Sequence, residues 1–287
     1  MSNLSLKLIV VITITLLSTL NIHSQEQKPI RYTDSNKGKF FFSWGGNRAN
    51  YTKSDITFTG DDYNFTIKDV TSKDRPKGYH IDYINPSRLT IPQTNAKIGY
   101  FISDKYAIAL ALDHMKYVVN QNQIVSIDGE INVASDQPGS VFNGTYQNDP
   151  IELTEEFLRF EHTDGLNFIH AQILRYDDIS SLFKIKNTDI FQLKIVEGLG
   201  AGVLYPKTNS QLLSKERADQ FHLSGYGVSA NLGLNFLFFK HFFIQLDVTG
   251  GFIDLNDIRT SSISSDRAEQ DFFYVQRIVK LGGIFRL

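Results

Sequence analysis

Alternating apolar and polar positions are the dominant pattern along this chain. In the segment 105–119, the even positions from 106 to 112 carry Tyr, Ile, Leu and Leu, and the odd positions carry alanine and then Asp and Met. A period of two predicts β-strands, because successive side chains of a strand point to opposite faces. Eight segments bounded by turn residues show this pattern. They are 39–50, 94–103, 105–119, 165–177, 189–205, 222–238, 241–255 and 272–287.

The composition of the two faces indicates which one points outward. In 222–238 bulky apolar side chains alternate with Gly, Ser and Asn, and 241–255 is divided in the same way. A soluble β-sandwich buries its bulky face and turns a polar face to water. Small residues suit a crowded interior better than a solvated surface, and large residues outside are what lipid requires. We therefore expect an all-β fold, an eight-stranded antiparallel up-and-down transmembrane barrel over 38–287. A soluble β-protein is the alternative.

The connections between these segments are short at one end and long at the other. Two turns are tight, 103–105 and 239–241, and 178–188 is of intermediate length. Four connections are long and polar: 51–93, 120–153, 206–220 and 256–270. Short periplasmic turns and long outer loops are typical of a membrane barrel. Within the first long connection, 55–70 alternates around Gly60 and is predicted to form a hairpin above the membrane.

Aromatic residues gather where the strands end, as in the interfacial girdles of membrane barrels. Near the short turns they are Tyr106, Phe191, Phe236, Phe238, Phe242 and Phe285. Near the long loops they are Tyr205, Phe252, Phe272 and Phe273.

The N-terminus has the features of a secretory signal peptide. Lys7 precedes the apolar run 8–20, and a small residue, Ser24, follows it. The run is too short for a comfortable membrane helix, although an uncleaved helical anchor is the alternative. We expect a signal peptide over 1–24 that is cleaved and a disordered leader over 25–37.

Composition excludes several classes of protein. The chain has no cysteine, so it has no disulfide scaffold, cysteine metal site or thiol nucleophile. Its formal net charge of −2 gives no electrostatic reason to expect a nucleic-acid partner. The mean hydropathy of −0.20 argues against a bundle of membrane helices. No motif indicates a cofactor or a metal site, and we expect neither.

The last strand carries a recognisable signature. Leu281, Gly283, Phe285 and Leu287 alternate up to the C-terminus. This run resembles the C-terminal assembly signal of bacterial outer-membrane barrels, except that Leu287 stands where an aromatic residue is usual. In plan the chain resembles small eight-stranded barrels such as the outer-membrane protein A, X and W types, and its Ser-Gln junction is similar to those common in Bacteroidota. The resemblance implies a bacterial outer-membrane location, contacts with outer-membrane lipid and lipopolysaccharide, assembly by the barrel-assembly machinery and a monomeric state.

Ionisable and polar residues fall at inward positions of the predicted strands, at similar heights. They are Lys97, Asp113, His170, Lys194, Asn231, Asp247 and Lys280. Charges away from water must be paired, so these residues predict a lumen network that fills the barrel and fixes its register.

The same residues allow a catalytic alternative. Asp113 and His170 are predicted on adjacent strands, and a histidine oriented by a carboxylate is able to deprotonate Ser229 or a water. No linear motif supports this triad.

Glu197 is an exception to the alternation, which sends it toward lipid. Because Gly198 and Gly200 follow it, we expect a β-bulge that turns Glu197 inward.

The sequence favours a porin-like barrel with a filled lumen and without enzymatic activity, which has a structural, adhesive or ligand-binding role through its outer loops. One alternative is a lipid A- or phospholipid-modifying hydrolase or acyltransferase. Another is a narrow pore for small apolar solutes.

Overall fold

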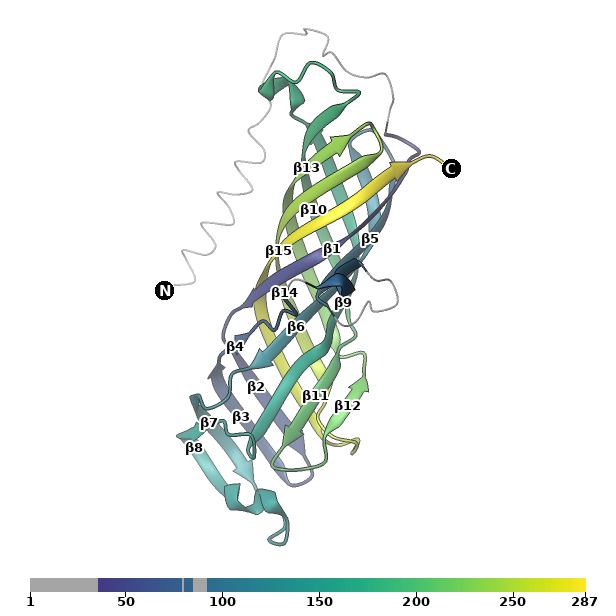
Figure 1. Cartoon of the computed structure of the whole chain (residues 1–287). Helices are drawn as coiled ribbons and strands as arrows, with labels where there is room; N and C mark the ends of the chain where they lie inside the picture. Colours follow the sequence, from purple (N-terminus) through teal and green to yellow (C-terminus); the bar gives the residue numbers. More distant parts are fainter. Residues whose placement is uncertain (1–35, 79, 85–91) are drawn as a thin grey trace. The chain divides into compact units, whose positions relative to one another are not determined.

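The computed structural model describes residues 36–78, 80–84 and 92–287, which form a β-barrel with an extension at one end (Figure 1). The predicted signal peptide and residues 25–35 of the predicted leader lie outside the described residues. The last two leader residues are described: the Asn36 side chain and the Lys37 amide both donate hydrogen bonds to Asp104. In the described part of the chain, no helix is long and apolar enough to cross a membrane.

Eight strands form a closed antiparallel ring. They are β1 (Phe40–Tyr51), β5 (Thr94–Phe101), β6 (Tyr106–Val119), β9 (Leu158–Asp178), β10 (Phe191–Leu204), β13 (Gly225–Phe238), β14 (Phe242–Arg259) and β15 (Arg267–Phe285). Around the ring they follow this chain order. The ring closes because β1 pairs with β15, from Phe40 opposite Phe285 to Tyr51 opposite Tyr274.

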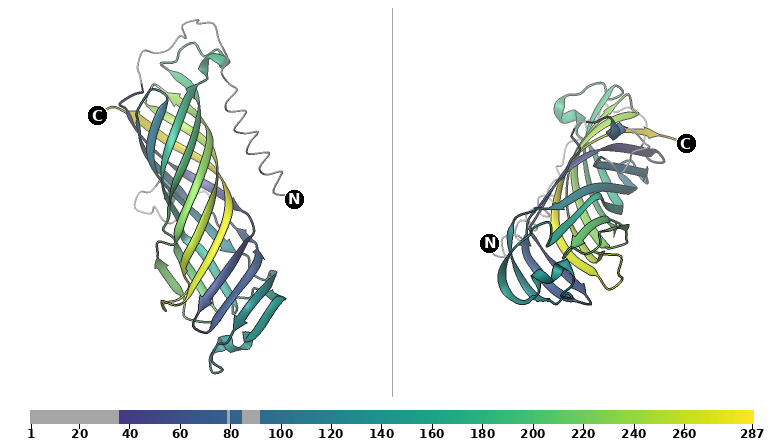
Figure 2. Two further views of the ribbon diagram at one scale, coloured as in Figure 1. Left: turned by 180° about the vertical axis from the view of Figure 1, so that it is seen from behind. Right: turned by 60° about the horizontal axis from the view of Figure 1, so that its bottom comes forward.

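The predicted barrel is confirmed. Each of the eight alternating segments is one strand of the ring, and neighbouring strands in sequence are neighbours in space. Figure 2 shows the tilted strands of the ring from behind. Tilt and closure leave no free edge in the ring, so every strand has a partner on both sides along most of its length.

One short turn shows how tightly the ring is connected. Between β13 and β14, Phe239 and Lys240 have φ angles of 51° and 67°. Two successive positive φ angles are the geometry of a tight hairpin turn whose twist matches that of the strands. The chain adopts it here without the Asn-Gly pair that usually marks such a turn.

The long connections carry further strands beyond the ring. The strands β2 (Ser54–Gly60) and β3 (Tyr63–Val70) form the predicted hairpin. They join the outer end of β15, and the strands β7 (Ile124–Ile131) and β8 (Gly144–Glu152) continue the sheet from β3. The strand β11 (Lys207–Leu212) pairs with β9 and with β12 (Ala218–Phe221), and β4 (Ser72–Lys73) pairs with β6. The short 3-10 helices described are η1 (Ile81–Ile84), η3 (Pro138–Phe142) and η4 (Ser180–Phe183).

The interior has three layers. At the short-turn end an apolar cluster forms around Phe41, Phe101, Leu237 and Phe243. The middle holds the inward-facing ionisable and amide side chains. At the outer end a larger apolar cluster, which we call the outer core, contains these residues among others: Phe58, Phe65, Tyr117, Phe160, Phe168, Ile253 and Phe272.

The outward face of the ring is apolar. Large exposed side chains form a belt there: Ile98, Ile108, Leu110, Ile173, Leu199, Val228, Leu232, Leu234, Ile244, Leu246, Val248, Val275, Val279 and Leu281. Most of the predicted girdle residues lie at its two borders. Phe272 is different, since it is buried and stacks on Tyr117 with ring centroids 5.0 Å apart. The expectation that Phe272 belongs to the outer girdle was wrong, because β15 already reaches the outer core at that residue.

Candidate functional site

The seven ionisable and polar residues predicted for the lumen all lie inside the ring. Each exposes less than a tenth of its surface. They come from seven strands, because the ring brings β5, β6, β9, β10, β13, β14 and β15 around one interior. Among them, the structure forms two close groups, one around Asp247 and one around Asp113.

The first group is a buried ion pair with amide neighbours. Lys280 on β15 pairs with Asp247 on β14. The Gln245 side chain donates to Asp247 Oδ1 at 2.8 Å and accepts from Asn235 at 2.9 Å. Gly233 makes room for the carboxylate, since a Cβ at that position would overlap Asp247 Oδ1. A buried pair of this kind is tolerated because both ions find partners at once.

The second group is held by a chain of amides that starts at β1. Asn47 donates to Asn95 Oδ1 at 2.8 Å, and Asn95 donates to Asp113 Oδ1 at 2.5 Å. The other carboxylate oxygen, Oδ2, lies 3.3 Å from His170 Nε2. The Asp113 carboxylate is thus fixed from two sides by groups on β5 and β9.

The His170 ring is held by stacking as well. It lies parallel to the Phe168 ring, with centroids 4.1 Å apart and an interplanar angle of 9°. Its second nitrogen, Nδ1, has no hydrogen-bond partner among the described residues. A Cβ on Gly200 would lie 2.7 Å from both His170 Nδ1 and Ser229 Oγ, so both atoms border the space that this glycine leaves open.

The structure therefore gathers the three catalytic candidates, Asp113, His170 and Ser229. Among the described residues, no hydrogen bond joins His170 Nδ1 to Ser229 Oγ, so proton transfer from the hydroxyl to the imidazole requires the two atoms to come into contact. The same contacts also serve stability alone, because they give partners to polar groups that water does not reach. Among the described residues, no three His, Asp or Glu side chains are grouped to hold a metal ion.

Of the remaining lumen candidates, one lies between these two groups and two lie elsewhere on the inner face. Lys97, on β5, faces the charges of Lys280, Asp247 and Asp113. Asn231, on β13, fills the space above Gly198. Lys194, on β10, is buried and lies opposite Asn235.

Comparisons with known proteins concern the architecture. No protein-family model matches the chain, and no curated protein matches it in sequence. Among solved structures, the chain is similar to the outer membrane protein OprG from Pseudomonas aeruginosa, with 12% identity, a TM-score of 0.40 and coverage of 88% of this chain and 98% of that one. For Ail, the attachment invasion locus protein of Yersinia pestis, the identity is 11%, the TM-score 0.31 and the coverage 87% and 99%. For the outer membrane protease OmpT from Escherichia coli, the identity is 8%, the TM-score 0.32 and the coverage 90% and 100%.

The fold itself is established by the strand order and the closure of the ring described above.

The last strand presents its signature residues to the outside. Leu281 and Phe285 are exposed on the outer face of β15, Gly283 lies between them, and Leu287 follows the end of the strand. Phe285 packs against Phe40 of β1, with ring centroids 6.3 Å apart, at the seam where the ring closes.

Glu197 does not turn inward. The pairing of β10 with β9 and with β13 continues past this residue without a shift, so the expected bulge is absent and that prediction was wrong. Glu197 stays on the outer face, opposite Arg175 of β9. The glycines that suggested a bulge, Gly198 and Gly200, instead make room for Asn231 and His170 inside the ring.

The outer core holds a histidine that the sequence did not single out. His162 is fully buried among aromatic rings and contacts Thr208 Oγ1 through Nδ1 at 2.9 Å. Burial lowers the pKa of His162 to about 3. The imidazole is therefore neutral at physiological pH and belongs to the packing of the outer core.

Proposed function

We propose that the chain is an integral barrel of the bacterial outer membrane, with an interior filled by side chains and a structural, adhesive or ligand-binding role at its outer end. The observation that carries this proposal is the reversal of the apolar face along single strands. On β14, Leu246 and Val248 face outward in the belt, whereas Ile253 and Leu255 face inward in the outer core. Strands of this kind suit a molecule that crosses hydrocarbon and then continues into water.

The outer extension supports the proposed role. The strand β8 is the last strand of its sheet, and it exposes most of its residues. A free strand edge presents unpaired backbone groups, which is a common way to bind an extended segment of a partner. Exposed apolar side chains nearby, Ile124 and Val141, add surface that a partner is able to cover.

Insertion and orientation are tested together. The folded barrel is expected to migrate faster than the heated chain on a gel, and protease added to intact cells is expected to cut within β7 and β8 and to leave the ring strands whole. Identical migration before and after heating, or cleavage of the ring in vesicles, contradicts the proposal.

A pore for small apolar solutes is the weaker alternative, because apolar clusters fill the interior at both ends of the polar layer. Planar-bilayer recordings are expected to show no conductance above that of the empty bilayer. Transport of an apolar solute into liposomes that carry the protein, at a rate above that of empty liposomes, would establish the pore.

A second candidate function is supported by the contact between Asp113 and His170 and by the free Nδ1 beside Gly200. It is modification of a lipid by acyl transfer or hydrolysis, with His170 as the base and Ser229 as the nucleophile. The test compares the lipid A profile of cells that lack the protein with the profiles of the same cells after they receive the wild type, the His170→Gln variant or the Ser229→Ala variant. If the acylation of lipid A changes without the protein and only the wild type restores it, the enzymatic function is established. An unchanged profile excludes the enzymatic function.

A further inference from the structure

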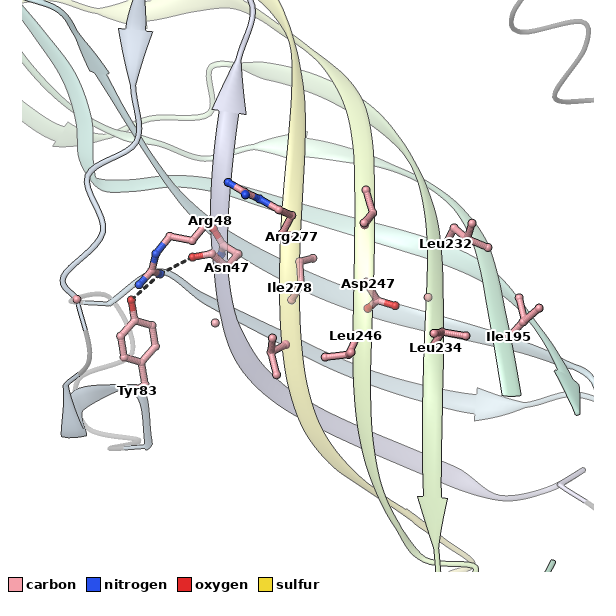
Figure 3. Close-up of a pocket in the computed structure, with 15 residues that line it drawn as sticks. Asn47, Arg48, Tyr83, Ile195, Leu232, Leu234, Leu246, Asp247, Arg277 and Ile278 are labelled. Atoms are coloured by element: carbon pink, nitrogen blue, oxygen red, sulfur yellow. Dashed lines mark hydrogen bonds between the residues drawn. The ribbon is translucent and has the colours of Figure 1, made fainter. Parts of the chain in front are cut away.

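Two arginines lie side by side on the outer face of the ring. Arg48 of β1 stands directly opposite Arg277 of β15. On the other side of Arg277, the opposite residue is Val248 of the apolar belt. Along β15, Val275 and Val279 flank Arg277 on the same outward face. Both arginines therefore interrupt a surface that is otherwise suited to hydrocarbon (Figure 3).

Over the residues that the structure describes, no carboxylate forms an ion pair with either of these two arginines. Among the described residues, neither guanidinium has an acidic group within 4.0 Å, and Asp74, the carboxylate that influences Arg48, accepts hydrogen bonds from the Ala49 amide and the Gln93 side chain. Like charges directly opposite each other on adjacent strands are destabilising. Arg175, an outward arginine near the short-turn border of the belt, shows the usual solution, since its Nε lies 2.6 Å from Asp177 Oδ2.

The hydrogen bonds of the two side chains use only part of their donors. Arg277 Nη2 reaches two register positions outward, to Asn50 Oδ1 at 3.2 Å. This is the direction in which arginine extends its charge toward the polar boundary of a bilayer. Arg48 Nη1 donates to Asn47 O at 2.7 Å and to Tyr83 Oη at 3.1 Å. Each guanidinium has five N–H donors, and these hydrogen bonds use one donor of Arg277 and two of Arg48.

An apolar groove begins at the arginine pair. It has a volume of about 940 Å³ and crosses the outer faces of β1, β15, β14 and β13 (Figure 3). Tyr83 borders it on the side of Arg48, where its ring packs over Gly46. The apolar walls are formed by Leu232, Leu234, Leu246, Val248 and Val279. A charged end next to an apolar channel matches a lipid with an anionic group and acyl chains.

We propose that this groove binds lipid A, with a phosphate group held between Arg48 and Arg277 and an acyl chain lying along the apolar walls. The inference rests on the proposed outer-membrane location, because that is where lipid A occurs. A phosphate monoester carries a charge of about −1.5 to −2 at pH 7, which balances two guanidiniums, whereas a phosphodiester carries only one charge. Arginine binds phosphate through paired N–H groups, and each of the two guanidiniums has donors that the hydrogen bonds above do not use.

Native mass spectrometry of the folded protein in detergent tests the site. With bis-phosphorylated lipid A added, we expect one lipid bound to each wild-type chain. The double variant Arg48→Ala/Arg277→Ala is expected to bind about tenfold or more weakly, since each charge-assisted interaction with phosphate is lost. The matched control Arg175→Ala removes an outward arginine that already has a carboxylate partner, and we expect it to bind like the wild type.

Three outcomes overturn the lipid site. They are equal binding by the double variant, equal binding of lipid A from which the phosphates were removed, and equal binding of phosphatidylglycerol, which carries one negative charge. Heat-modifiable migration checks that each variant is folded, and Arg48→Lys/Arg277→Lys, which keeps the charges, is expected to retain more binding than the alanine pair. A folded barrel that binds no lipid A contradicts this site alone, whereas a chain that does not insert into vesicles contradicts the proposed barrel function.

Discussion

The ring at the level of the apolar belt and the outer part of the same strands place their apolar side chains on opposite faces. In the ring, Asp247 and Lys280 are inside, and Leu246 is outside. Farther along, Ile253 is inside, and Asp254 takes an intermediate position on the outward face. The backbone continues through both regions on β14, so the difference lies in the side chains. The proposed location accounts for it, with hydrocarbon around the ring and water around the outer part. The comparison teaches that the apolar face of a strand points inward or outward according to the medium around it. One strand is able to have its apolar face outside at one end and inside at the other.

The largest effect is expected from removing one partner of the buried ion pair. The substitution Asp247→Leu leaves Lys280 without its carboxylate inside the ring, and we expect a loss of about 3–5 kcal/mol of unfolding free energy. Urea unfolding in lipid vesicles measures this. The matched control is Asp254→Leu, the same change on the same strand in the outer part, for which we expect a loss below about 1 kcal/mol. Equal losses for the two substitutions would mean that the two regions do not differ in their interior.

The outer core is expected to respond to the loss of an aromatic ring. Phe272→Ala removes a buried ring that stacks on Tyr117, and it is expected to destabilise the outer part by about 3–4 kcal/mol. Because the ring strands retain their own pairing, limited proteolysis is expected to cut β2 and β3 sooner while the ring stays resistant. Loss of the heat-modifiable form in this variant would show instead that the two parts unfold together.

The outward face is compared by placing lysine in each region. Leu246→Lys brings an ammonium into the apolar belt and is expected to cost about 2–4 kcal/mol in vesicles. Glu269→Lys is made on the exposed face of β15 in the outer part, and it is expected to change the stability by less than about 0.5 kcal/mol. If both lysines are tolerated equally, the belt does not face hydrocarbon.

Acid is expected to weaken the outer part through His162. Its pKa is near 3 in the folded protein and about 6.5 in an unfolded chain, so between these values only the unfolded state takes up the proton. The contribution of the neutral His162 to the unfolding free energy is complete well above pH 6.5. It falls as the pH decreases, by about 2 kcal/mol between pH 6.5 and pH 5. His162→Gln is expected to remove this part of the slope when the protease susceptibility of the outer strands is measured at several pH values. An unchanged slope in the variant would assign the acid sensitivity to other groups.

Alternation was sufficient to predict the ring. The eight strands, their order and the inward position of residues such as Asp113 and Lys280 follow from a period of two and from the turn residues. The contact between Asp113 and His170 follows from adjacent strands, although its distance depends on the register, which the sequence does not specify.

The outer part was harder to predict from the sequence. The strand β7 was missed within a connection that is long and polar on average, although Val125, Ile127 and Ile131 alternate there. Phe272 was placed in the girdle because alternation alone does not show where the apolar face changes from outside to inside. Glu197 was assigned to a bulge because glycines weaken a strand, whereas here their missing side chains make room for larger neighbours inside the ring. The arginine pair was missed because Arg48 and Arg277 are far apart in the chain and meet only where the ring closes.

The reversal of the apolar face is tested most directly by labels at single positions, and the absence of cysteine makes each introduced thiol unique. Environment-sensitive fluorophores are attached to Leu246→Cys and to Asp271→Cys in protein inserted into vesicles. We predict that brominated acyl chains quench only the first label and that iodide in the water quenches only the second. Quenching of the label at position 246 by iodide but not by brominated lipid would place the belt in water and contradict the account.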